Sequence, residues 1–177
     1  MIDTATLDDY GVLVEPGTLR IQRLLPGPIE RVWAWITESD LRRRWLAAGD
    51  MDPRAGASFE LIWRNDELTD PPGQRPEEFG AEHRLQTHVI AADPPRSLSF
   101  AFGPHGDVRI DLEPQGEEVL LTLIHSRIPD RGTLISVGPG WHMHLDILAA
   151  RIRDQEPAPF WDGWLRLKQN YAERLLG

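Results

Sequence analysis

The stretch GPGWHMHLDIL, Gly138–Leu148, sets a tryptophan and two histidines directly behind a glycine–proline–glycine run. Beyond that run, Trp141, His144, Leu145 and Leu148 recur at the spacing of one helix face. Glycine and proline punctuate local structure, so the stretch predicts a helix that begins here. Rings on the buried face of such a helix either fill an ordinary core or line a hollow that receives a ligand. The number of aromatic residues does not separate the two.

Strands are predicted ahead of this helix. Segments with alternating or continuous apolar residues occupy 18–26, 58–64, 81–93, 97–103, 106–114 and 117–126. Two short helices are predicted between the first two of these strands, one from Pro28 to Ile36 and one over 40–47. The basic cluster Arg42–Trp45 in the second helix is expected to form a solvated face. This order predicts an α+β fold whose helices lie on one side of an antiparallel sheet.

A chain of 177 residues fits one domain. We expect an irregular N-terminal segment over 1–17 and a single domain over 18–177. The last part of that domain, about 157–177, is predicted to be a helical tail that carries Trp161 and Trp164. The loop Asn65–Phe79 is polar and rich in proline, so we expect it to be mobile and to act as an entrance flap.

Composition excludes several function classes. The chain has no cysteine, which excludes a disulfide framework and thiolate chemistry. It carries 28 acidic and 19 basic residues, a net charge of −9, which argues against nucleic acid and anionic membranes as partners. The N-terminus lacks the pattern of a secretory signal, and no apolar stretch reaches the roughly 20 residues of a membrane span. We therefore expect a cytoplasmic protein.

Five stretches of the sequence resemble a known family when they are taken in order. They are IERVWAWITESDLRRRWL, GASFELIW, DPPRSLSFAF, EEVLLTLIHS and GPGWHMHLDIL, within residues 18–153. Their order and spacing resemble the START-like, or SRPBCC, superfamily, in particular the branch named after activators of the Hsp90 ATPase. The resemblance implies a helix-grip fold. In that fold a curved antiparallel sheet of about seven strands surrounds a long C-terminal helix, two short helices follow the first strand, and a cavity lies between sheet and helix.

The helix-grip arrangement would turn side chains of the sheet and the helix into a shared apolar pocket with a few polar points. The predicted ligand-binding residues are Phe59, Leu61, Trp63, Phe100, Phe102, Leu121, Leu123, His125, Trp141, His144, Leu145 and Leu148. A small hydrophobic or aromatic ligand would be held by burial and oriented by the two histidines. No catalytic residue is assigned, because a histidine on an apolar face more often has a structural, hydrogen-bonded role.

The aligned apolar faces and the two histidines make a small-molecule-binding protein the leading hypothesis. The superfamily itself does not share one activity. Two alternatives stay open: a co-chaperone-like module that binds a chaperone through its outer surface, and a cyclase or hydratase with His125 or His144 as proton shuttle. No cofactor is predicted, and no metal, since His142 and His144 would lie about 200° apart around a helix. A homodimer through strand edges or through the Trp161 and Trp164 tail is a further prediction.

Overall fold

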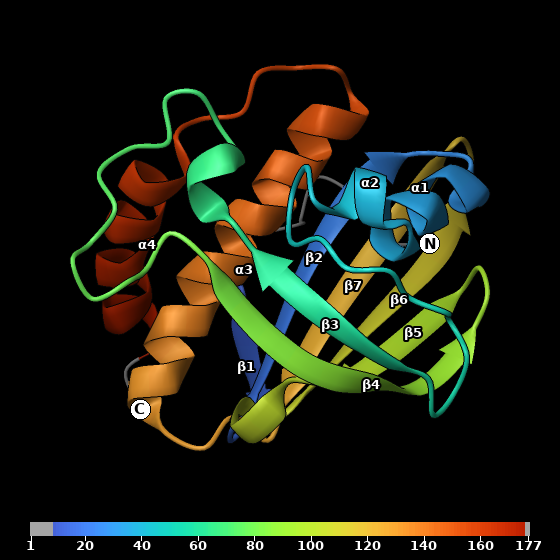
Figure 1. The fold of residues 1–177 in the computed structure, drawn as a ribbon, viewed down its shortest axis with the longest axis horizontal. Helices are drawn as coiled ribbons and strands as arrows, with labels where there is room; N and C mark the ends of the chain where they lie inside the picture. The colour runs from blue at the N-terminus through green and yellow to red at the C-terminus, as the bar shows by residue number, and fades with distance from the viewer. Residues whose placement is uncertain (1–8, 176–177) are drawn as a thin grey trace.

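One curved antiparallel sheet wraps around a long helix in the computed structural model, which describes residues 9–175 (Figure 1). Its strands are β1 (Val12–Glu15), β2 (Thr18–Pro26), β3 (Ser58–Trp63), β4 (His83–Asp93), β5 (Ser97–Ala101), β6 (Asp107–Gln115) and β7 (Glu118–Ser126). Within the described residues the seven strands are ordered β1-β2-β7-β6-β5-β4-β3. This architecture confirms the predicted α+β helix-grip fold.

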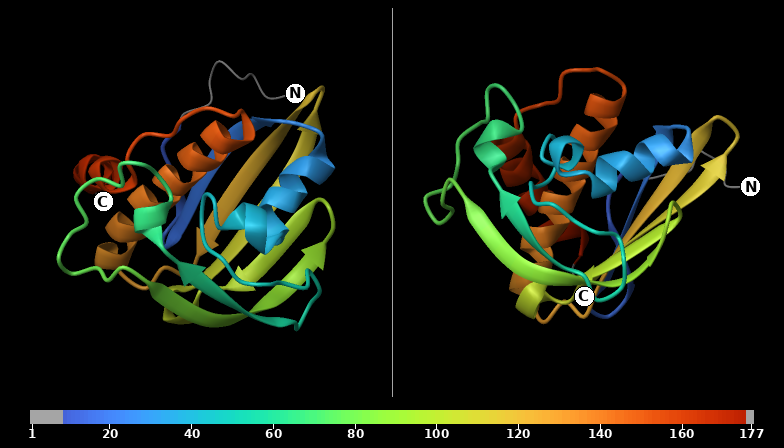
Figure 2. Two further views of the ribbon diagram at one scale, coloured as in Figure 1. Left: turned by 45° about the horizontal axis from the view of Figure 1, so that its top comes forward. Right: turned by 45° about the vertical axis from the view of Figure 1, so that its right-hand side comes forward.

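The helices cover the concave side of the sheet and one flank. They are α1 (Ile29–Thr37), α2 (Ser39–Arg42), α3 (Arg131–Ile152) and α4 (Phe160–Arg174), with short 3-10 turns at η2 (Asn65–Glu67) and η3 (Gly103–His105). Figure 2 shows α3 inside the curve of the sheet and α4 beside it on the outer flank. The predicted helical tail, about residues 157–177, thus contains α4. This helix packs against α3 and is not a continuation of it.

The expectation of an irregular segment over 1–17 is wrong for Val12–Glu15. These residues form β1, which pairs antiparallel with β2 through a turn at Gly17, whose φ is +76°. The strand is too short for a period-two pattern to stand out in the sequence. Just before it, the Arg23 guanidinium donates to the Asp9 carbonyl at 2.6 Å, and the Gly11 N–H donates to the Tyr171 hydroxyl at 2.7 Å. Residues 1–8 of the predicted segment lie outside the described residues.

Helix α3 begins at Arg131, earlier than the glycine–proline–glycine run predicted. Its N-cap is Asp130, whose carboxylate accepts a hydrogen bond from the Thr133 N–H at 2.7 Å. Pro139 lies inside the helix. The flanking glycine has a packing role, because a Cβ at Gly138 would come within 3.2 Å of the Tyr171 ring on α4. The run therefore marks the close approach of two helices and not the start of one.

The second short helix is also shorter than predicted. It ends at Arg42, and the expectation of a solvated basic face is wrong for this residue, whose exposure is only 1%. The Arg42 guanidinium donates to the carbonyls of Ile36 and Thr37 at the end of α1 and to those of Ala47 and Gly49 beyond α2. One buried cation thus satisfies four backbone acceptors and fixes the chain between α1 and β3.

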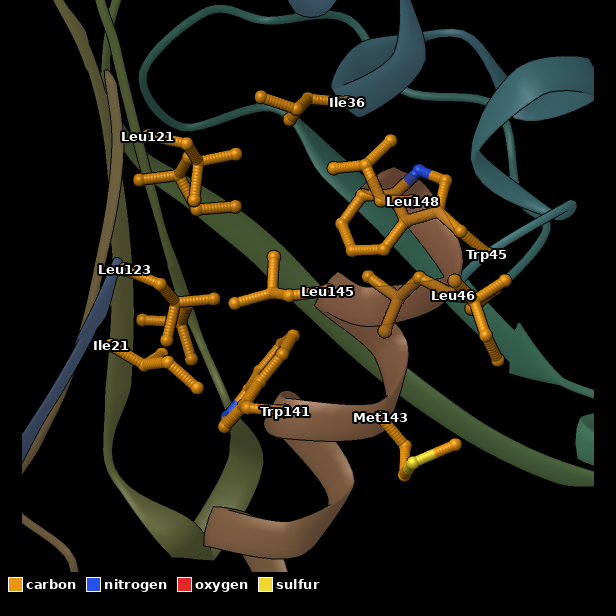
Figure 3. Packing of buried hydrophobic residues seen from close by; sticks show 14 of the residues in the cluster. Ile21, Ile36, Trp45, Leu46, Leu121, Leu123, Trp141, Met143, Leu145 and Leu148 are labelled. Carbon is orange, nitrogen blue, oxygen red and sulfur yellow. The ribbon is translucent and has the colours of Figure 1, made fainter. Parts of the chain in front are cut away.

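The middle of the space between sheet and α3 is filled by side chains. Figure 3 shows Leu145 between Leu121 and Leu123 of β7 on one side and Leu46 on the other. Leu121, Leu123, Leu145 and Leu148 are all fully buried. Burial of each such side chain contributes about 1.5–3 kcal/mol. The helix stripe predicted from the sequence is therefore a core stripe in this part of the molecule.

Candidate functional site

A cavity of about 660 Å³ lies at the end of the sheet where α3 begins and α4 packs beside it. Its floor on α3 is formed by residues four apart, Gly132, Ser136, Gly140 and His144, which share one helix face. The other walls come from the sheet, from the β3–β4 loop and from the start of α4. These walls include Trp63, Asn65, Phe79, His83, Leu85, Phe102, Phe160, Trp161 and Trp164.

Aromatic rings from four separate segments form a continuous lining. Phe79 of the loop stacks on Trp161 with ring centroids 5.3 Å apart and meets Trp164 edge-on at 5.2 Å. Across the cavity, Trp63 and Phe102 meet edge-on at 5.8 Å. On α3 the lining residues before His144 are Gly132, Ser136 and Gly140, with Thr133 and Val137 beside them. Pockets lined mainly by apolar and aromatic side chains with a few polar groups are typical of small-molecule sites.

His144 is the polar end of the floor. Its Nδ1 lies 2.8 Å from the Trp45 carbonyl, and its exposure is 6%. A carbonyl only accepts, so Nδ1 carries the proton and donates to it. Burial lowers the pKa of His144 to about 4, which keeps the imidazole neutral near pH 7. In a neutral imidazole with its proton on Nδ1, the Nε2 atom is a hydrogen-bond acceptor.

Carboxylates are the charged groups of the cavity wall. Glu78, Glu82 and Asp130 line it, and among the described residues no arginine or lysine does. Glu82 forms ion pairs with Arg64 and Arg84, at 3.0 and 2.8 Å. Asp130 is engaged as the α3 cap. Within the described residues the wall therefore offers a bound anion no arginine or lysine, and its other ionisable side chains are the histidines His83, His105 and His144.

The β3–β4 loop, predicted to be an entrance flap, is anchored to α4. Trp161 Nε1 donates to Asp66 Oδ1 at 2.8 Å, and the Asp162 carboxylate accepts from the Gln74 N–H at 3.0 Å. The Phe160 N–H donates to the Thr69 hydroxyl at 3.1 Å. These bonds hold the loop over the start of α4, and the flap role itself stays a prediction.

The twelve predicted ligand-binding residues separate into three groups. Trp63, Phe102 and His144 line the cavity, and Trp141 lines an adjoining hollow of about 130 Å³ together with these three. The other eight lie in the packed core: Phe59, Leu61, Phe100, Leu121, Leu123, His125, Leu145 and Leu148. Leu61 and Phe100 border only a void of about 10 Å³, too small for an organic ligand. The binding roles of all twelve stay predictions.

His125 is fully buried and both of its ring nitrogens are bonded. Trp141 Nε1 donates to His125 Nδ1 at 3.0 Å, so the ring proton is on Nε2, which donates to the His105 carbonyl at 2.7 Å. Burial lowers the pKa of His125, which favours this neutral form. The geometry therefore gives His125 a structural role that ties α3 to the sheet, and it does not favour a proton shuttle.

Sequence reasoning missed Phe79, Ser136, Gly140 and Phe160 as cavity residues. The sequence predicts Trp161 and Trp164 only as parts of a helical tail and of a dimer contact. The one available signal was the four-residue spacing from Gly132 to His144, which places small residues on one helix face.

Two further observations bear on the class of protein. No helix among residues 9–175 combines the length and the apolar character needed to cross a bilayer. In the same part of the chain, no three histidine, cysteine, aspartate or glutamate side chains are grouped so that they would hold a metal ion.

The chain resembles several solved structures. The protein encoded by gene BPP1335 from Bordetella parapertussis is 35% identical over 100% of this chain and 97% of that chain, with a TM-score of 0.80. CalU16 from Micromonospora echinospora is 22% identical over 88% and 86% of the two chains, with a TM-score of 0.64. DynU16, a protein in the dynemicin biosynthetic locus, is 19% identical over 81% of this chain and 49% of that chain, with a TM-score of 0.62.

No curated protein matches the chain. The family model that matches is "Activator of Hsp90 ATPase homolog 1-like protein", over residues 26–153, which include the sheet from β3 to β7 and helix α3. Because this family model matches well over half of the chain, the chain belongs to the family of Activator of Hsp90 ATPase homolog 1-like proteins.

Proposed function

We propose that the protein binds a small, mainly apolar aromatic molecule in the cavity between α3, α4 and the β3–β4 loop. The observation that carries the proposal is the cavity itself, about 660 Å³ and lined by aromatic rings from β3, from the β3–β4 loop and from α4. This volume lies in the range of small-molecule sites. Three of the lining rings are tryptophans, so binding of a ligand would change the tryptophan fluorescence of the protein.

Filling the cavity should abolish binding. A Cβ at Gly140 has Trp164 Nε1 at 4.0 Å as its nearest neighbour, so a side chain there would project into free space. We expect Gly140→Phe to weaken the binding of any cavity ligand at least tenfold. The measurement is a titration with flavonoids, polyketide-like aromatics and fatty acids, followed by tryptophan fluorescence.

The control is Leu165→Phe, which adds a ring of similar size on the exposed face of α4, where Leu165 is 43% exposed. It should bind like the wild type. A second variant that fills the cavity, Ser136→Phe, shows whether a loss of binding in Gly140→Phe comes from the filled cavity or from the replacement of that glycine in the helix. If none of the compounds saturates the wild-type protein, or if the filled variants bind as well as the control, the proposal fails.

Chaperone binding is a second candidate, and the family match favours it. It would use the outer surface and would not need the cavity. The test is the ATPase rate of a purified Hsp90-type chaperone with increasing amounts of this protein. Stimulation by Gly140→Phe equal to that by the wild type would assign the effect to a surface separate from the cavity, and a flat response to both would remove this candidate.

A further inference from the structure

His144 presents an acceptor atom to the cavity. Its Nδ1–H is used by the Trp45 carbonyl, which leaves the lone pair of Nε2 free of any hydrogen-bond partner within the described part of the chain. The ring itself is about nine-tenths buried and lines both the main cavity and the adjoining hollow. Nε2 keeps some access to solvent, because it is not among the fully buried side-chain atoms that lack a partner, whereas Asn65 Oδ1 of the same cavity lining is. A ligand donor bonded to Nε2 would replace water there, and such a bond contributes about 0.5–1.5 kcal/mol.

The floor leads a ligand directly to this atom. Gly132, Ser136 and Gly140 precede His144 at intervals of four residues, each about 6 Å along the helix. Thr133 and Val137 line the cavity beside them, and the three small residues leave a strip that the edge of one flat ring system can cover. The Phe160 ring lies 4.9 Å from the imidazole and closes the end of the strip. A ring edge that reaches this end therefore meets the imidazole as its polar contact.

The wall disfavours negative charge. Its carboxylates belong to Glu78, Glu82 and Asp130, and no arginine or lysine among the described residues lines the cavity. Glu82 is paired with Arg64 and Arg84, so the uncompensated charge of the wall comes from Glu78 and Asp130, and the other ionisable groups besides His144 are the imidazoles of His83 and His105. A ligand carboxylate would lose its hydration without an arginine or lysine to pair with, which is costly. Near Nε2 of His144, a ligand carboxylate would also place two hydrogen-bond acceptors against each other with no proton between them. The charge of the wall and the tautomer of the His144 imidazole thus both favour an uncharged ligand with a hydrogen-bond donor.

We infer that the cavity selects uncharged, flat aromatic molecules that carry a hydroxyl or N–H donor, with that donor bonded to Nε2 of His144. The inference rests on the proposed function and narrows it, since fatty acids and other carboxylates are excluded as preferred ligands. His144 is a specificity residue here, and no reaction is assigned to it.

Three probes of nearly equal size test the inference near pH 7: naphthol, methylnaphthalene and naphthoate. Naphthol offers a donor, methylnaphthalene offers none, and naphthoate carries a charge. We expect naphthol to bind the wild type about tenfold or more tightly than either of the others, measured by calorimetry and by tryptophan fluorescence. Equal affinities for naphthol and methylnaphthalene, or a preference for naphthoate, would overturn the inference.

Two variants of His144 assign the preference to one atom. His144→Asn places its amide near the position of Nδ1, so it keeps a donor for Trp45 and removes the acceptor at Nε2. His144→Gln reaches the position of Nε2 and supplies a carbonyl oxygen there. We expect the preference for naphthol over methylnaphthalene to fall below threefold in His144→Asn and to persist in His144→Gln. Circular dichroism and a cooperative urea-unfolding transition show that each variant is folded.

The outcomes separate the inference from the function on which it rests. If all probes bind the wild type and Gly140→Phe blocks them, but His144→Asn keeps the full preference for naphthol, the cavity is a binding site and the role of His144 is wrong. If neither these probes nor the wider ligand panel saturates the wild type, the proposed function itself is wrong.

Discussion

Replacing Arg42 with alanine is expected to lower the free energy of unfolding by about 3–5 kcal/mol, a large part of the stability of a typical domain. The guanidinium is 1% exposed and donates to four backbone carbonyls, two at the end of α1 and two after α2. Alanine would leave these acceptors without their donor and would open a cavity among them. Urea unfolding followed by tryptophan fluorescence measures the change.

The pKa of Arg42 shows that burial of this cation is itself unfavourable. Desolvation lowers the pKa of the Arg42 guanidinium from its usual value to about 10, with the Asp50 carboxylate acting in the opposite direction. The side chain is therefore retained for its directed donors, because burial of the charge alone would destabilise the fold. This reasoning predicts that Arg42→Lys, with one compact group of donors, recovers only part of the loss.

Arg43 is the matched control for Arg42. It is the adjacent residue, carries the same side chain and is exposed. Arg43→Ala should change the free energy of unfolding by less than about 0.5 kcal/mol. If the Arg42 and Arg43 variants unfold at the same urea concentration, the bonds to the carbonyls do not support the fold as argued here.

Periodicity in the sequence was enough to predict the strands from β2 to β7 and the buried face of α3. Trp141, Leu145 and Leu148 do point into the interior, as their spacing predicts. Periodicity reports which face of an element is buried. It does not report whether the opposite faces touch, and in the middle of this molecule they do. The predicted cavity residues on β7 are core residues for that reason.

The cavity walls could not be predicted in the same way. Phe79, Trp161 and Ser136 come from a loop, from α4 and from α3, and no local pattern links three positions so far apart. Their meeting depends on α4 folding back beside α3, where Gly138 admits the Tyr171 ring. The burial of Arg42 has the same origin. Its charge is visible in the sequence, but the carbonyls that it satisfies come together only after α1 and β3 have packed.

Acid should destabilise the protein through His144. Burial lowers the pKa of this residue from 6.5 to about 4, and the unfolded chain restores the higher value. Between these two pH values the unfolded state binds a proton that the folded state does not. The contribution of His144 to the free energy of unfolding is therefore fully present above about pH 6.5 and is lost as the pH falls toward 4. The shift corresponds to a loss of about 3 kcal/mol. Burial lowers the pKa of His125 as well, which adds to the loss in the same direction.

The variant His144→Asn separates this contribution from all others. It keeps a donor for the Trp45 carbonyl and has no group that titrates in this range, so its unfolding free energy should depend less on pH. At about pH 7 the wild type should be at least as stable as the variant, and toward pH 4 the variant should gain on it by up to about 3 kcal/mol. His88→Asn removes an exposed histidine and should follow the wild-type curve throughout. Urea unfolding at a series of pH values gives the three curves. A difference between wild type and His144→Asn that stays constant with pH would contradict this prediction, because His144 would then bind its proton with the same pKa in the folded and the unfolded states.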